Sequence, residues 1–210
     1  VYRALLPLLR REQCAGIRCV VLGGEEVHPH DVARFRELMP PGAVFVNGLG
    51  PTESTTALQF FQPATRALSG TVVPVGHAVA DTEVLLLDAA GRPTAVTGEI
   101  AIRGRHVALG YWRQPELTAG AFSERPGEPS RRTYRTGDMG RRRPDGAIEF
   151  LGRRDAQVKL RGQRVELGEI EACLAACPGV RLSAVTVVTA PSGDAMLAAF
   201  VVPAPGAELT

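Results

Sequence analysis

The stretch that decides the fold covers residues 17–24 and reads Ile-Arg-Cys-Val-Val-Leu-Gly-Gly. This short apolar run, ended by two glycines, predicts a buried strand. Residues 29–39 follow with a proline and an acidic residue near their start, which predicts a helix. Residues 43–46 form a second short apolar run. Buried strands that alternate with helices indicate a parallel sheet covered by helices.

Outward from this stretch, residues 2–12 place leucines among arginines with helical spacing and predict an amphipathic helix. The sequence pattern changes from about residue 69. Short β-type runs separated by Gly, Pro and Asp turns occupy residues 72–75, 83–87, 99–103 and 147–151. These runs predict a small antiparallel sheet or barrel, with an exposed loop at residues 123–132 and a hairpin turn at residues 144–146.

The last third of the chain predicts a separate α+β unit. Its elements are a hairpin, a helix with one apolar face and two further strands, at residues 157–166, 168–177, 183–189 and 196–202. We therefore expect a large part followed by a small domain, with the boundary near residues 153–155. The expected divisions are an α/β part, a β-rich part and an incomplete small domain, at residues 1–68, 69–152 and 153–210.

Composition excludes several classes of function. The formal net charge of +2, from 24 Lys plus Arg and 22 Asp plus Glu, gives no general reason to expect nucleic acid or an anionic membrane as a partner. The sequence contains no apolar run of about 18 residues, the length of a membrane helix, so we expect a cytoplasmic protein. The spacings of the 4 cysteines and 4 histidines match no zinc or redox site. Any phosphate ligand must therefore be bound at a local site.

A first cluster of chemically useful residues covers residues 47–55 and reads Asn-Gly-Leu-Gly-Pro-Thr-Glu-Ser-Thr. It follows a predicted strand, and ligands of α/β sheets bind outside the carboxyl ends of strands. Glycines and a proline hold a tight backbone, Thr52 offers a hydroxyl group, and Glu53 offers a hard oxygen for Mg²⁺. A structural turn with a helix N-cap at Ser54 or Thr55 explains the same residues.

Two further clusters lie closer to the C-terminus. Residues 134–138, Tyr-Arg-Thr-Gly-Asp, end in a carboxylate that can accept both hydroxyl groups of a ribose. A solvated Asp in a turn is the alternative interpretation. Residues 152–171 form a long, richly charged run, for which composition alone favours a solvated face.

In this order, the clusters resemble core motifs of nonribosomal peptide synthetase adenylation domains, which are adenylate-forming, AMP-binding enzymes. Residues 47–53 resemble Asn-x-Tyr-Gly-Pro-Thr-Glu, and residues 134–138 resemble Tyr-(Arg/Lys)-Thr-Gly-Asp. Residues 98–112 resemble the run from Gly-Glu-Leu-x-Ile-x-Gly to Gly-Tyr-Trp. Residues 152–171 match Gly-Arg-x-Asp-x-Gln-Val-Lys-Ile-Arg-Gly-x-Arg-Ile-Glu-Leu-Gly-Glu-Ile-Glu almost letter for letter. The resemblance covers nearly the whole chain and implies a large ATP-holding domain followed by a mobile small domain.

The resemblance also implies roles for individual residues. Those expected around ATP or AMP are Gly24, Leu49 and Gly50 at the adenine, Thr52 at the α-phosphate, Asp138 and Arg153 at the ribose, and Phe150 nearby. Thr52 and Glu53 are the expected catalytic residues, with Glu53 on Mg²⁺. Asp155 matches the hinge of the small domain, and Arg161 and Gly162 match the path of the carrier's pantetheine arm.

The amino-acid pocket is assigned by the same resemblance. Its positions hold neither a charge nor a large ring and are Val21, Gly23, Gly48, Thr56 and Ala57. A neutral, aliphatic, valine-like amino acid is therefore the expected substrate. The implied reaction makes its adenylate from ATP and passes it to the phosphopantetheine thiol of a carrier protein. A small MbtH-like helper protein is a further candidate partner.

The sequence departs from the family pattern in ways that leave alternatives open. Leu49 stands where the motif has Tyr, which removes ring stacking worth about 0.5–1.5 kcal/mol. The family's phosphate loop, amine-binding Asp and catalytic Lys are not among these residues, so the chain alone is expected to be inactive. The alternatives are an acyl- or aryl-CoA ligase, or a degenerate domain kept as a docking surface. Tyr111 and Trp112 are interpreted as core or packing residues, with contact to a partner as the alternative.

Overall fold

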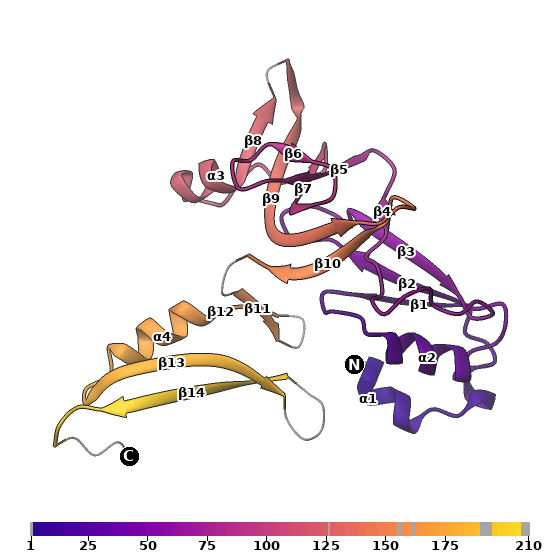
Figure 1. Ribbon diagram of the computed structural model, residues 1–210, viewed down its shortest axis with the longest axis horizontal. Helices are drawn as coiled ribbons and strands as arrows, with labels where there is room; N and C mark the ends of the chain where they lie inside the picture. The colour runs from indigo at the N-terminus through magenta and orange to yellow at the C-terminus, as the bar shows by residue number, and fades with distance from the viewer. Residues whose placement is uncertain (1, 126, 155–156, 161–162, 190–194, 207–210) are drawn as a thin grey trace. The chain divides into compact units, whose positions relative to one another are not determined.

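The computed structural model describes residues 2–125, 127–154, 157–160, 163–189 and 195–206 (Figure 1). The chain divides into two compact units, Val1–Arg154 and Asp155–Thr210. This division falls two residues beyond the predicted bound at residue 152. Asp155, Arg161 and Gly162 lie outside the described residues.

A four-stranded sheet begins the first unit. Its strands, in spatial order, are β1 (Cys19–Gly23), β2 (Val44–Leu49), β3 (Leu58–Pro63) and β4 (His77–Ala78). β1 and β2 are parallel, as predicted, but β3 pairs antiparallel with both β2 and β4. The short connection between β2 and β3 suffices to turn the chain back, whereas a parallel connection requires a longer crossover. The sheet is therefore mixed, and β3 was not predicted.

Helix α2 (Pro29–Leu38) joins the two parallel strands and covers one face of their sheet (Figure 1). Its Phe35 is fully buried and meets Phe45 of β2 edge to face, with ring centroids 5.4 Å apart. Asp31 accepts a hydrogen bond from the His28 backbone N–H at 2.9 Å, which caps the first turn. Arg3 pairs with the same buried carboxylate at 2.8 Å and attaches the N-terminal segment to the helix.

The single helix predicted at residues 2–12 is wrong. The segment forms one helical turn and two short 3₁₀ helices: α1 (Tyr2–Leu5), Leu6–Leu8 and Arg11–Cys14. Pro7 lacks a backbone N–H, and Leu9 takes an extended conformation at φ −87° and ψ 139°. Leu6 is buried and Leu9 packs against the same core, whereas Leu5 and Leu8 are exposed.

The β-rich part of the first unit is an antiparallel sheet, as predicted. Its order is β10-β9-β7-β5-β6, with β8 also paired to β9. The bounds are β5 (Thr82–Leu87), β6 (Pro93–Thr94), β7 (Thr97–Gly104), β8 (Phe122–Arg125), β9 (Glu128–Arg142) and β10 (Ile148–Arg153). The predicted hairpin turn at residues 144–146 is confirmed between β9 and β10. Helix α3 (Pro115–Ala121) leads into β8.

Two predictions for this part are wrong. The exposed loop predicted at residues 123–132 is instead β8 and the start of β9. Its charged residues are compatible with a strand because Glu124 and Arg132 pair across the two strands. Residues 72–75 are not a strand, although Val73 and Val75 are buried. Pro74 between them cannot donate a ladder hydrogen bond.

Gly76 joins the two sheets of the first unit. It forms an isolated antiparallel bridge with Ile148, whose N–H donates to the Gly76 carbonyl at 2.8 Å. Gly76 has φ +95°, and a Cβ at this position would lie 1.9 Å from the Gln59 carbonyl oxygen. Only glycine fits such a crossing of backbones.

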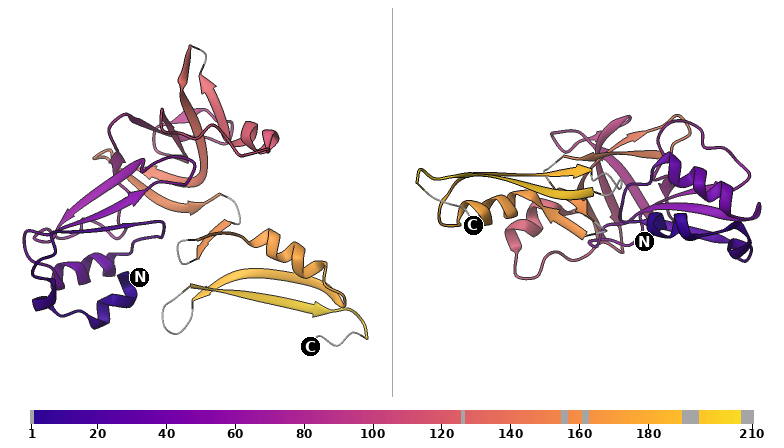
Figure 2. Two further views of the ribbon diagram at one scale, coloured as in Figure 1. Left: turned by 180° about the vertical axis from the view of Figure 1, so that it is seen from behind. Right: turned by 90° about the horizontal axis from the view of Figure 1, so that it is seen from below.

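The second unit contains the predicted elements. Hairpin β11–β12 precedes helix α4, which lies along hairpin β13–β14 (Figure 2). The bounds are β11 (Gln157–Leu160), β12 (Gln163–Glu166), α4 (Leu167–Ala175), β13 (Val180–Thr189) and β14 (Ala195–Pro203). Glu171 of α4 accepts a hydrogen bond from the Val185 backbone N–H at 2.8 Å, which ties the helix to the hairpin.

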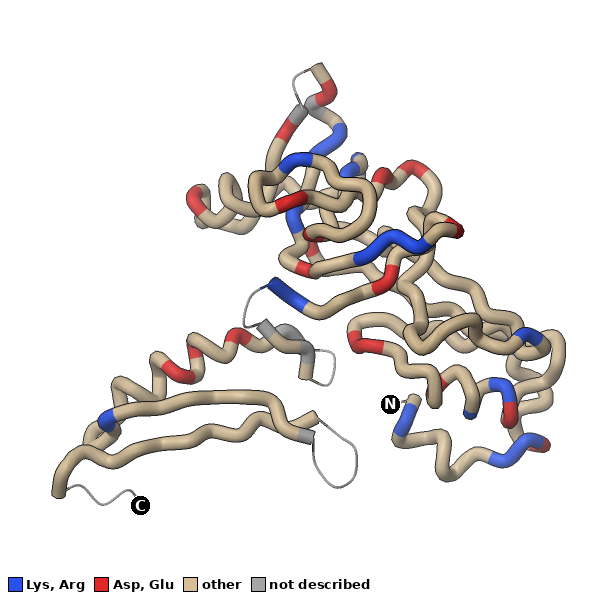
Figure 3. The backbone as a smooth tube through the Cα atoms, viewed as in Figure 1, with Lys and Arg blue, Asp and Glu red and all other residues tan. Residues whose placement is uncertain are grey.

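Acidic and basic positions alternate along the backbone in the β-rich part of the first unit (Figure 3). Among the residues that the structure describes, no helix is long and apolar enough to span a membrane.

Candidate nucleotide and substrate site

The carboxyl ends of the parallel strands bring three predicted pocket residues together. Gly23 of β1 stands opposite Gly48 of β2, and a Cβ on Gly23 would lie 3.2 Å from the Gly48 carbonyl oxygen. A Cβ on Gly48 would meet the Thr56 Cγ2 at 3.8 Å. The chain returns so closely that a Cβ on Gly50 would lie 2.6 Å from the Thr56 Cα. The glycines therefore allow the backbone segments to approach closely at the end of the sheet where a ligand is expected.

The other predicted residues of this region differ in exposure. Val21 is 65% exposed, and Gly24, with φ +84°, is exposed directly after β1. Leu49 and Ala57 are buried in the hydrophobic core, where their side chains pack with Leu58. The adenine contact of Leu49 and the substrate contact of Ala57 stay predictions.

Glu53 is held by Tyr111, a residue that the sequence interpretation did not assign to the site. The Tyr111 hydroxyl donates a hydrogen bond to the Glu53 carboxylate at 2.7 Å, and its ring meets Phe122 edge to face at 5.3 Å. Burial, followed by the bond to Glu53, raises the pKa of the Tyr111 phenol and keeps it protonated as a donor. Trp112 is 85% exposed, so the prediction that it packs is wrong.

Asp138 lies at an irregularity in the antiparallel sheet. Glu99 of β7 pairs with Met139 of β9, yet Ala101 pairs with Arg135, so residues 136–138 of β9 bulge opposite one residue of β7. The Thr136 hydroxyl donates to the Ile100 carbonyl at 2.7 Å and accepts from the Asp138 backbone N–H at 3.0 Å. Bulges re-aim side chains and are common beside active sites.

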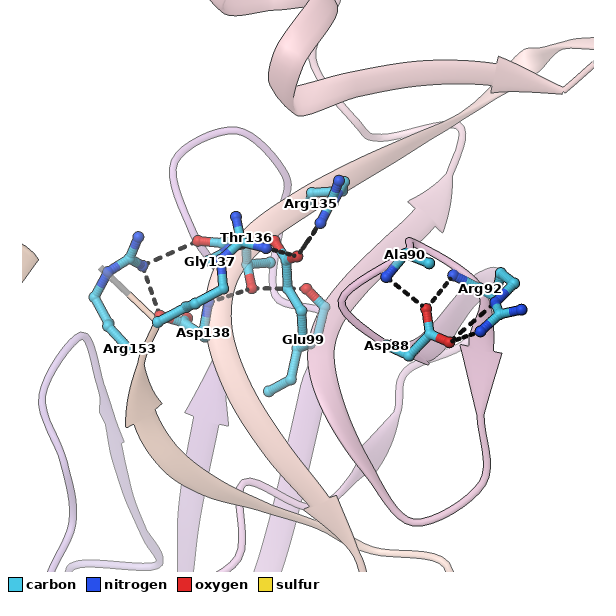
Figure 4. A network of polar contacts seen from close by, with 11 residues as sticks. Asp88, Ala90, Arg92, Glu99, Arg135, Thr136, Gly137, Asp138 and Arg153 are labelled. Carbon is cyan, nitrogen blue, oxygen red and sulfur yellow. Dashed lines mark hydrogen bonds and ion pairs between the residues drawn. The ribbon is translucent and has the colours of Figure 1, made fainter.

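Arg153 and Asp138, which the sequence analysis assigns to the same ribose, are neighbours and form a buried ion pair. They stand opposite each other on β10 and β9, and the Arg153 Nη1 lies 2.7 Å from the Asp138 Oδ1. The two side chains are 8% and 3% exposed. Arg153 also donates to the Thr136 carbonyl at 3.0 Å (Figure 4). Burial makes such a charge-assisted bond strong and directional.

Glu99 is a site residue that the sequence interpretation missed. Its carboxylate is 3% exposed and accepts bonds from the Gly137 backbone N–H and from the side chains of Arg135 and Arg154. The available signal was an acidic residue inside the apolar run of residues 98–104, where an unpaired charge would be costly.

A single hydrophobic core supports both clusters. Leu49, which precedes the first loop, and Tyr134, which precedes the second, belong to it together with Ile100 and Ile148. Both motif segments are therefore anchored in the same hydrophobic core of the first unit.

Comparison with known proteins agrees with this arrangement, because residues 1–112 match the family described as AMP-binding enzyme. The chain belongs to the AMP-binding enzyme family. Tyrocidine synthase 2 of Brevibacillus parabrevis is 38% identical over 206 residues, which is 96% of this chain and 6% of that protein. This AMP-binding enzyme sequence therefore spans less than a tenth of that relative.

Solved structures show the same fold. The crystal structure of IdnL1 matches with a TM-score of 0.85 at 35% identity, over 100% of this chain and 43% of that one. Holo-PA1221 is described as a nonribosomal peptide synthetase protein containing adenylation and PCP domains. It matches with a TM-score of 0.84 at 32% identity, over 99% and 36% of the two chains. The fold is that of the C-terminal part of an adenylate-forming domain.

The donor set of this AMP-binding enzyme fits magnesium in one respect. In the part of the chain that the structure describes, no three His, Cys, Asp or Glu residues gather as a metal site. Mg²⁺ commonly takes only one or two carboxylates from the protein and completes its shell with water and substrate phosphates. A single carboxylate held in place, as Glu53 is by Tyr111, matches that requirement.

Proposed function

We propose that the domain containing this chain activates an amino acid as its adenylate and transfers it to a carrier thiol in nonribosomal peptide synthesis. The observation that carries the proposal is that residues 49–57 and residues 134–138 contribute to the same hydrophobic core. The similarity to a tyrocidine synthase supports amino-acid activation. The adenylation and PCP domains named for holo-PA1221 support a carrier protein as the partner.

The proposed nucleotide site uses the two loops differently. Gly24, Leu49 and Gly50 surround the adenine, and Thr52 donates to the α-phosphate. Asp138 accepts the ribose hydroxyls while Arg153 orients its carboxylate, with Phe150 beside them. Glu53 holds Mg²⁺, which when bound neutralises charge on the phosphates.

Adenylyl transfer needs alignment more than covalent help from protein groups. A buried Asp138–Arg153 pair fixes the ribose, and so limits where the α-phosphorus can lie relative to the incoming carboxylate. The tight turn at Gly50 brings residues 50 and 56 together at the end of the sheet, beside the proposed pocket glycines. Positioning of this kind supplies the catalysis that the chain's own residues can offer.

The proposed substrate is a neutral, aliphatic, valine-like amino acid, since Val21, Gly23, Gly48, Thr56 and Ala57 supply neither charge nor a large ring. One methylene changes selectivity by only about 1–3 kcal/mol, so close neighbours should also react. Asp155 is the proposed hinge, and Arg161 with Gly162 the proposed pantetheine path. An MbtH-like helper protein and cytoplasmic location belong to the same proposal.

Amino-acid-dependent ATP–pyrophosphate exchange by the complete domain tests the activity, and loading of a phosphopantetheinylated carrier tests the acceptor. We expect exchange to be highest with small aliphatic amino acids and loading to need the carrier thiol. A strong preference for Asp, Glu, Lys or Arg would reject the substrate assignment. Transfer to coenzyme A with no carrier loading would indicate a CoA ligase instead, and no exchange with any amino acid would reject the proposed activity.

A further inference from the structure

We propose that Glu99 is a positioning residue that fixes the loop of residues 136–138 for nucleotide binding and joins this loop to Arg154, the last residue of the first unit. The inference rests on the proposed function, which places the ribose at Asp138. Glu99 itself need not touch the nucleotide. Its role is to hold the backbone that carries the ribose-binding carboxylate.

The two carboxylate oxygens of Glu99 divide the contacts between backbone and side chains. Oε1 accepts the Gly137 backbone N–H at 3.1 Å. Oε2 accepts the Arg135 Nη2 at 2.5 Å and the Arg154 Nη1 at 3.0 Å (Figure 4 shows the bonds to Gly137 and Arg135). Because Glu99 is buried in β7, the position of these acceptors is set by the sheet rather than by solvent.

Gly137 is the residue at which the loop turns, with φ +74°. Its N–H is held by Glu99, and its carbonyl accepts the Arg154 backbone N–H at 2.9 Å. Both sides of this residue are thus fixed, one by β7 and one by the strand end that leads to residue 155. The next residue, Asp138, can then present its carboxylate in only a narrow range of directions.

The contact with Arg154 adds a second consequence. The backbone N–H of Arg154 donates to the 136–138 segment, and its guanidinium group donates to Glu99. The Arg154 side chain is nevertheless 56% exposed. The residue next to the proposed ribose-binding Asp138 and the last residue of the first unit are therefore both bonded to the buried Glu99 carboxylate. Glu99 thus holds the 136–138 segment and the end of β10 together within the first unit.

The test compares Glu99→Gln with Glu149→Gln in the complete domain. Glu149 of β10 is also buried and accepts two bonds from Arg141, at 3.0 and 2.6 Å, so it is held by an arginine outside the loop of residues 136–138. We expect Glu99→Gln to weaken AMP binding about tenfold and to raise KM for ATP more than it lowers kcat. The Glu149→Gln control should change AMP affinity less than about twofold.

A second readout needs no nucleotide. Hydrogen exchange of the Gly137 and Asp138 amides should accelerate in Glu99→Gln and stay at the wild-type rate in Glu149→Gln. If Glu99→Gln does not fold, Arg154→Gln replaces it and should weaken AMP binding about threefold. If both glutamate variants had the same AMP affinity and the same hydrogen-exchange rates at Gly137 and Asp138, the inference would be overturned. If the wild-type domain failed to bind AMP, the proposed function would be overturned instead. The hydrogen-exchange comparison would still decide whether Glu99 holds residues 136–138.

Discussion

The two motif loops share a core but are secured in different ways. In the loop of residues 134–138, Thr136 and Asp138 are buried, and strand neighbours bond their side chains. In the loop of residues 50–57, Thr52 and Thr56 are exposed. Under the proposed assignments, the ribose-binding carboxylate is buried and held by protein contacts, whereas the hydroxyl assigned to the α-phosphate is exposed. Substitutions of Thr52 and Glu53 should therefore affect the chemical step more than nucleotide affinity.

The largest effect is expected from Glu53→Gln, which removes the charge that would face Mg²⁺. Loss of one preorganised electrostatic group should lower the rate of pyrophosphate exchange by about 10²–10³. Affinity for AMP, measured by calorimetry without metal, should stay within about twofold, because the ribose side is built independently. A parallel loss of AMP affinity would show that the two loops are not separable.

Asp138→Ala should act on affinity instead. Hydrogen bonds to a charged group contribute about 1.5–3 kcal/mol, so binding of AMP and ATP should weaken alike by about 10- to 100-fold. Calorimetry with both nucleotides measures the effect. Asp88→Ala is the control, because Asp88 stabilises its own turn through the Ala90 and Arg92 backbone N–H groups. Wild-type AMP affinity in Asp138→Ala would contradict the ribose assignment.

Tyr111→Phe tests the side-chain bond that ties Glu53 to the β-rich part. The ring keeps its packing on Phe122 while the hydroxyl donor disappears. We expect the Mg²⁺ concentration for half-maximal exchange to rise about tenfold. In the control Tyr2→Phe, the lost hydroxyl bonds the Asp31 carbonyl elsewhere in the unit, so the magnesium requirement should not change.

Thr52→Val should give the smallest effect, because the exposed Thr52 hydroxyl exchanges a bond with water for one with the phosphate, and its loss should lower the rate of pyrophosphate exchange by about threefold to tenfold. Thr55→Val, in the same exposed loop, is the matched control and should leave pyrophosphate exchange unchanged. Identical rates for the two variants would remove Thr52 from the phosphate site and narrow the contrast between the loops.

Periodicity and turn chemistry predicted the elements that carry strong local signals. The apolar run before Gly23 and the helix that starts at Pro29 lie where the sequence placed them. Strand β3 was missed because its pairing depends on the reversal at Gly50, which is a tertiary contact. Glu99 could be noticed as an acidic residue in an apolar strand, but its partner Gly137 follows only from the bulge between β7 and β9.

Gly76 constrains how this AMP-binding enzyme could be recombined with a relative. A chimaera joined near residue 69 would take β3 from one parent and Gly76 with Ile148 from the other. The crossing beside the Gln59 carbonyl tolerates no side chain at residue 76, and it does so through backbone atoms alone. Parents of quite different side-chain composition should thus remain compatible at this seam as long as both carry glycine there. Exchange of the segments before and after residue 69 is limited at this point by the need for a residue without a side chain at position 76.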